Sequence, residues 1–115
     1  MQRILVADNE PEIVNSMKEM LSPYYIVDIA TYGFEVLKLC GEIKYDGIIM
    51  DIDFGAGING IEIATLLREK DKTVKIIIFS AVAYSKEIKQ KANDLCVFFF
   101  EKPIDLEKVL KSFDT

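Results

Sequence analysis

A short stretch near the middle of the chain carries acids where a buried strand would end. The apolar residues of DGIIMD, 46–51, end at Asp51, and Asp53 follows in a loop rich in glycine. A carboxylate in such a place costs free energy unless a cation or hydrogen-bond donors meet it. Other apolar runs also lead into polar residues, namely Asp8, Ser80 and Lys102. Such a set of carboxylates, hydroxyl and amine can bind a cation and a phosphoryl group.

Each residue type has a chemical role in such a site. Asp51 can act as a nucleophile toward phosphorus. Asp8, Asp51 and a backbone carbonyl near Asp53 offer oxygen ligands to a hard cation, and we expect Mg²⁺. Ser80 can donate a hydrogen bond to a phosphoryl oxygen, and Lys102 can pair with its charge. Alone, each residue also fits an ordinary role as a cap, turn or surface residue, so the site depends on their convergence.

These residues meet only if their strands are parallel and share one sheet. Apolar runs predict strands at 3–7, 24–30, 46–51, 74–80 and 96–101. Apolar residues at helical spacing predict helices at 10–21, 33–41, 61–70, 85–94 and 105–113. Several strands are apolar throughout, which is typical of a parallel sheet covered on both faces. The sequence therefore predicts an α/β fold with a doubly wound, five-stranded parallel sheet, and one edge carries every strand's carboxyl end.

The helix ends and the cysteines allow local predictions. We expect Asn9 to cap the helix at 10–21 and Gly41 to close the second helix. Cys40 and Cys96 lack metal-ligand spacing and lie in apolar stretches, so both are predicted to be buried, reduced thiols.

The composition excludes several classes of function. The 115 residues are enough for one domain, and half of them are hydrophobic. A net charge of −5 argues against nucleic-acid binding. No apolar run approaches the roughly 20 residues that cross a bilayer, and no signal peptide is evident, so we expect a cytoplasmic protein without membrane contact. The absence of histidine excludes a Ser-His-Asp triad within this chain.

Four segments, ILVADNEPEI, YDGIIMDI…NGIE, IIIFSA and FEKP, occur in this order. With them the chain resembles the receiver domains of two-component response regulators over essentially its whole length. The resemblance implies one receiver domain at 1–115, with no output domain in these residues. It also implies a flavodoxin-like (βα)5 fold with strand order 2-1-3-4-5, and a phosphoacceptor signalling domain that is not an enzyme.

The resemblance assigns Asp51 as the acceptor of a phosphoryl group from the phosphohistidine of a sensor kinase or phosphotransfer protein. It implies a Mg²⁺ site made by Asp8, Asn9, Asp51 and the backbone carbonyl of Asp53. The family usually has a second acid where this chain has Asn9. We therefore expect weaker Mg²⁺ binding and slower phosphorylation, unless Glu10 or Asp53 compensates.

The resemblance also implies how a signal would leave the site. Ser80 would move onto the phosphoryl group, Lys102 would pair with it, and Phe99 would act as the aromatic switch. The Lys102–Pro103 peptide bond would be cis. The polar helix at 85–94 has little to bury, so it is expected to be the least stable element. A downstream effector protein, or a homodimer partner, would bind the surface of the 85–93 helix, the fifth strand and the last helix.

Two other functions stay open at this point. Asn9 suits a pseudo-receiver, an interaction module that works without phosphorylation. The pair Asp51 and Asp53 also resembles the Asp-x-Asp motif of haloacid-dehalogenase-type phosphatases, although those enzymes normally place it on the first strand. A flavin-binding module is disfavoured because the acidic ADNEPE segment after the first strand would repel a phosphate.

Overall fold

The computed structural model describes residues 1–55, 57–81 and 84–114, and these form five strands and five helices in strict alternation. The strands are β1 (Arg3–Ala7), β2 (Ile26–Ala30), β3 (Gly47–Asp51), β4 (Lys75–Ser80) and β5 (Phe98–Glu101). The helices are α1 (Pro11–Leu21), α2 (Gly33–Glu42), α3 (Gly60–Lys70), α4 (Lys86–Asp94) and α5 (Leu106–Phe113). All paired strands are parallel, in the order β2-β1-β3-β4-β5, which confirms the predicted fold.

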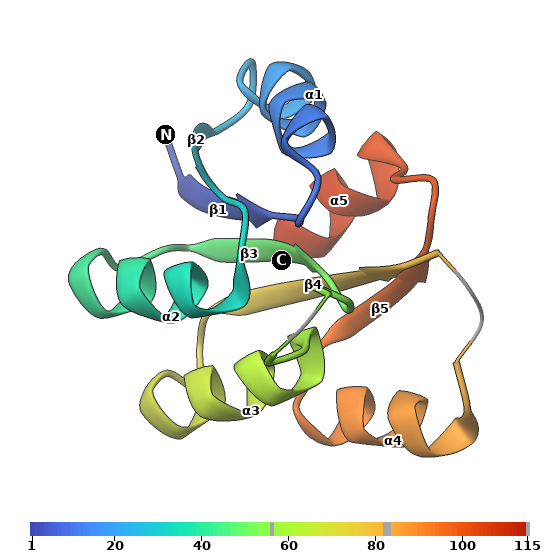
Figure 1. The fold of residues 1–115 in the computed structure, drawn as a ribbon. Helices are drawn as coiled ribbons and strands as arrows, with labels where there is room; N and C mark the ends of the chain where they lie inside the picture. Colours follow the sequence, from blue (N-terminus) through green and yellow to red (C-terminus); the bar gives the residue numbers. More distant parts are fainter. Residues whose placement is uncertain (56, 82–83, 115) are drawn as a thin grey trace.

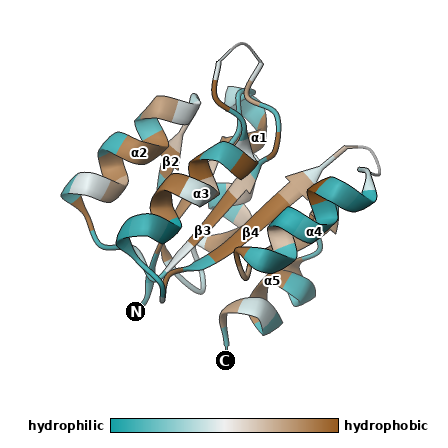
Figure 2. Cartoon of the chain, turned by 90° about the horizontal axis from the view of Figure 1, so that it is seen from below, coloured by the Kyte–Doolittle hydropathy of each residue, from teal (hydrophilic) through white to brown (hydrophobic). Residues whose placement is uncertain are grey.

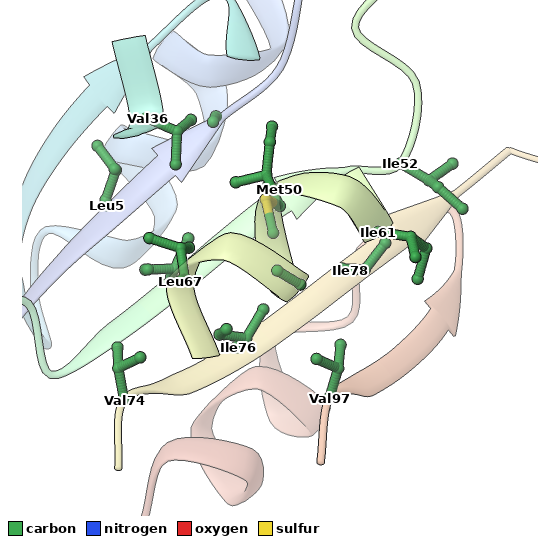
Figure 3. Close-up of a cluster of buried hydrophobic side chains, with 14 of the residues drawn as sticks. Leu5, Val36, Met50, Ile52, Ile61, Leu67, Val74, Ile76, Ile78 and Val97 are labelled. Atoms are coloured by element: carbon green, nitrogen blue, oxygen red, sulfur yellow. The ribbon is translucent and has the colours of Figure 1, made fainter. Parts of the chain in front are cut away.

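The sheet separates two helical layers (Figure 1). Helices α1 and α5 cover one face, and α2, α3 and α4 cover the other. The central strands are apolar on both sides because alternate residues enter different cores. Ile76 and Ile78 pack in the cluster beneath α2 and α3 (Figure 3), whereas Ile77 packs against α1 and α5.

The starts and ends of two helices differ from prediction. Glu10, not Asn9, takes the N-cap position of α1, and Asn9 is exposed. Within the part of the chain that the structure describes, no side chain bonds to the first helical amides as a cap of α1; the Oδ1 of Asp8 instead accepts the backbone N–H of the N-cap residue Glu10 at 3.0 Å. Gly41 does not close α2 either, since the helix continues to Glu42 and is capped at Ile43.

The cysteine prediction is wrong for Cys96, which is exposed, while Cys40 is half-buried. Cys96 follows the end of α4 with a φ of 55°, in the left-handed region, so the turn carries its side chain away from the apolar stretch. The fifth strand begins two residues later than predicted, at Phe98. No helix among the described residues has both the length and the apolar character needed to span a bilayer.

Candidate functional site

The carboxyl ends of β1, β3 and β5 bring three predicted residues into direct contact. The ammonium of Lys102 lies 3.1 Å from Asp8 Oδ2 and 3.3 Å from Asp51 Oδ2. Asp8 is 2% exposed, and Lys102 and Asp51 are half-buried. One ammonium therefore bridges two carboxylates at the sheet edge, where parallel α/β folds bind ligands.

The charges at this edge do not balance, because one cation meets two anions. Burial, followed by the negative charge of Asp8, raises the pKa of Asp51 despite the opposing effect of Lys102. Burial alone would lower the pKa of Lys102, but the hydrogen bond that its ammonium donates to Asp8 and the charges of both carboxylates raise it. The site thus holds an amine that stays protonated beside a carboxylate, Asp51, whose ionised form is disfavoured.

Ser80 occupies the neighbouring strand end, as the sequence predicts. It is 0% exposed at the end of β4, one residue beyond Phe79, the register partner of Asp51. Its carbonyl accepts the backbone N–H of Lys102 at 2.7 Å, which fixes the lysine segment against β4. The Lys102–Pro103 bond is cis, as expected.

The loop after Asp51 is organised by its own side chains. Asp53 is exposed, and its Oδ1 accepts the N–H of Gly55 at 2.8 Å. Gly60 begins α3 so close to β3 that a Cβ there would lie 2.8 Å from the carbonyl oxygen of Asp51. Asn59 caps α3 by accepting the N–H of Glu62, whose carboxylate accepts the N–H of Asn59 in return. The Asn-x-x-Glu spacing before an apolar run could have predicted this capping box.

The predicted metal ligands are all oxygen donors, which is the chemistry that Mg²⁺ requires. Asp8 and Asp51 both contact the ammonium of Lys102. Asn9 lies beside the loop that follows Asp51, because its amide nitrogen is 3.8 Å from the point that a Cβ added to Gly55 would occupy. Among the described residues, no group of three or more acids, histidines or cysteines comes together as a metal site. The residues therefore fit a hard cation only if amide or backbone oxygens complete the set.

Phe99 is half-buried on β5, at the edge of the core beneath α2 and α3. Its ring meets that of Tyr84 edge-on, with 5.9 Å between centroids. The sequence interpretation did not single out Tyr84. Since no local pattern links a loop aromatic to a strand 15 positions later, only the fold reveals this pair.

Comparison with known sequences decides the family of the chain. A family model described as "Response regulator receiver domain" matches residues 4–114. The chain belongs to this receiver domain family. MalR of Bacillus subtilis, a transcriptional regulatory protein, is 29% identical over 94% of this chain and 47% of its own length. The chain thus spans about half of that relative.

Two further relatives match over nearly their full lengths. The chemotaxis protein CheY of Listeria monocytogenes is 27% identical, covering 99% of this chain and 97% of that protein. The structure of response regulator TrrA from Thermotoga maritima, in complex with Mg²⁺-BeF, has a TM-score of 0.83 and 34% identity. The structural match covers 97% of this chain and 99% of the TrrA chain.

Proposed function

We propose that this receiver domain accepts a phosphoryl group on Asp51 from the phosphohistidine of a sensor kinase or phosphotransfer protein. The observation that carries this proposal is the Lys102 ammonium between Asp8 and Asp51 at the carboxyl edge of the sheet. An oxygen of Asp51 attacks phosphorus, the phosphorus–nitrogen bond breaks, and the donor imidazole leaves with its electron pair. The product is an acyl phosphate on Asp51.

The neighbouring side chains would stabilise the added charge. Lys102 pairs with the phosphoryl oxygens as a point charge, and Ser80 donates a hydrogen bond from its hydroxyl. Asp8, Asn9, Asp51 and the carbonyl of Asp53 would hold Mg²⁺, which neutralises repulsion between carboxylates and phosphate. The Mg²⁺-BeF complex of TrrA supports a metal in this role.

The output of the domain is proposed to be conformational. Movement of Ser80 toward the phosphoryl group would free space for Phe99, whose partner Tyr84 lies just before α4. The surface of α4, β5 and α5 would then bind an effector or a second copy. It offers Phe98, an exposed aromatic residue on β5. We place this activity in the cytoplasm, where sensor kinases present their phosphohistidine.

Intact mass after incubation with acetyl phosphate tests the acceptor role. Wild type with Mg²⁺ should gain one phosphoryl group, and Asp51→Asn should gain none. Asp105→Asn is the matched control, because it makes the same chemical change at the N-cap of α5, where Asn caps equally well. Loss of the gain in the control, or its persistence in Asp51→Asn, would contradict the assignment.

One observation favours a second candidate, the pseudo-receiver. Asn9 stands at the ligand position where the family has an acid, and the described part of the chain contains no three-acid metal cluster. A wild type that gains no mass at any Mg²⁺ concentration, but gains it after Asn9→Asp, would support this alternative. The phosphatase alternative is not retained because the family match covers residues 4–114.

A further inference from the structure

Arg68 is a buried cation outside the proposed phosphorylation site. It lies on α3, near the C-terminal end of the helix, and is 9% exposed. Its guanidinium donates hydrogen bonds to four backbone carbonyls, and within the described ranges it has no carboxylate partner. A charge this deeply buried is stable only with several well-placed acceptors. The four carbonyls supply them, so Arg68 joins backbone segments instead of forming an ion pair.

The four carbonyls come from two separate segments. Nη1 donates to Asp71 and Val74, which lie in the connection from α3 to β4. Nε donates to Leu95 at 2.7 Å and Nη2 to Cys96 at 3.2 Å, 27 and 28 residues further along the chain. Leu95 is the C-cap of α4, and Cys96 is the residue that follows it. Because the guanidinium is a rigid planar fork, it holds the end of α4 at a fixed place on α3.

The same end of α4 is closed by its own backbone. Cys96 N–H bonds to the carbonyl of Asn93 at 3.0 Å, and Val97 N–H bonds to that of Ala92 at 2.9 Å, which is the Schellman pattern. Cys96 takes the left-handed position usually given to glycine. A non-glycine residue keeps such a conformation only when its surroundings enforce it. The bond from Arg68 to the Cys96 carbonyl is one of these constraints.

The opposite end of α4 is closed by local bonds. The hydroxyl of its N-cap residue Ser85 accepts the N–H of Ile88 at 3.3 Å, and the carbonyl of Ser85 accepts the N–H of Lys89 at 3.1 Å. Ile88 is half-buried against the core beneath α2 and α3. Within α4, which the structure describes in full, Ala92 is the single buried residue and lies in the C-terminal half. Most residues of the helix are hydrophilic (Figure 2). Within the described residues, the side-chain hydrogen bonds that another helix makes to α4 therefore lie at its C-terminal end.

From this asymmetry we propose that Arg68 is the pivot of α4. When the domain switches, the N-terminal end of α4 changes position while Leu95 and Cys96 stay bound to α3. Arg68 is thus a positioning residue for the output surface and touches none of the groups that would react. The phosphorylation-driven movement rests on the proposed function, but the pinned end is a property of the unphosphorylated protein.

Amide hydrogen exchange at single-residue resolution tests the pivot. In the unphosphorylated wild type, the amides of Leu95, Cys96 and Val97 should exchange about tenfold more slowly than those of Ile88 and Lys89, the first amides bonded to the cap.

Arg68→Gln should lower that protection about tenfold, since hydrogen bonds from a charged group are lost. Lys70→Gln, which removes an exposed charge from the same helix end, should leave it unchanged. If Arg68→Gln does not fold, Arg68→Lys keeps the charge without the fork and should show the same local loss, to a smaller extent.

Three results would overturn the pivot. The first is equal exchange at the two ends of α4 in the wild type, and the second is undiminished protection of 95–97 in the Arg68 variants. The third is an equal loss of protection at the strand amides of Ile49 and Ile77, because Arg68 would then affect only global stability.

Acetyl phosphate with Mg²⁺ tests the movement itself. In the wild type, phosphorylation should change the amide exchange rates of residues 86–91 but not those of residues 95–97. In Arg68→Gln, the change in exchange rates should extend to residues 95–97. No gain in mass would refute the phosphoacceptor function and the movement that depends on it. The comparison of unphosphorylated proteins still decides separately whether Arg68 holds α4.

Discussion

Two glycines in this chain should respond to the same substitution with opposite signs. Gly60 begins α3, and a Cβ there would lie 2.8 Å from the carbonyl oxygen of Asp51 and 3.0 Å from Cα of Ile52. Both obstacles are backbone atoms, so no side chain can rotate away. At Gly41, which lies within α2, an added Cβ would have no neighbouring atom of the described residues within 4 Å outside the local helix backbone. The two variants Gly60→Ala and Gly41→Ala therefore separate steric cost from helix propensity.

The magnitudes follow from these contacts. To restore an ordinary contact of 3.4 Å or more, α3 and the end of β3 must separate by about half an ångström. Overpacking of this kind costs roughly 1–3 kcal/mol, so Gly60→Ala should lower the free energy of unfolding by that amount. Gly41→Ala should raise it by about 0.5–1 kcal/mol, because alanine loses less backbone entropy in a helix.

Urea unfolding followed by far-ultraviolet circular dichroism measures both changes. The same displacement moves the backbone of Asp51, so Gly60→Ala should also slow the gain of mass from acetyl phosphate, while Gly41→Ala should not. A Gly60→Ala protein as stable as wild type would refute the argument from close approach. A destabilised Gly41→Ala would show that the space beside Gly41 is needed by something else.

The remaining predictions concern single contacts. Cys96→Gly should raise the free energy of unfolding by about 0.5–1 kcal/mol, since glycine adopts the φ of 55° without strain; an unchanged urea midpoint would contradict this. Tyr45→Phe should lower the free energy of unfolding by about 1 kcal/mol, because the hydroxyl of the buried Tyr45 donates a hydrogen bond to Asp28 Oδ2 at 2.8 Å. Burial would raise the pKa of Asp28, but the hydrogen bonds from Arg3 and Tyr45 outweigh it and lower the pKa. This stabilisation is therefore present above the unfolded-state pKa and lost as the pH falls through the folded one, so the deficit of Tyr45→Phe should shrink in unfolding measured near pH 3. Asn9→Asp should tighten Mg²⁺ binding about tenfold by adding a carboxylate at the loop, and equal affinities in titration calorimetry would exclude Asn9 as a weak ligand.

The strands and their convergence could be predicted from sequence because both follow from strong, repeated signals. Uniformly apolar runs such as the one before Ser80 identify buried parallel strands, and parallel strands must place their carboxyl ends on one edge. Asp8, Asp51 and Lys102 meet for that reason. The prediction needed only the direction of each strand and no detail of packing.

The errors arose where one contact decides between similar conformations. Asn9 is a good capping residue by type, yet the bond from the Glu10 N–H to the Asp8 carboxylate accompanies a start one residue later, with Glu10 at the N-cap position. Cys96 lies in an apolar stretch, yet the turn that ends α4 rotates it outward. The role of Arg68 left no trace in the sequence, since its partners are backbone carbonyls that any residue could provide.

The division of the core by the sheet has a consequence for how this domain tolerates change. Val14 of α1 and Ile63 of α3 are both fully buried, but they lie in different clusters on opposite faces. Substitutions that share no contacts usually have additive effects on stability. Mutations on one face should therefore change the free energy of unfolding independently of mutations on the other face. The α4 side can change to fit a new partner while the packing beneath α1 and α5 stays the same.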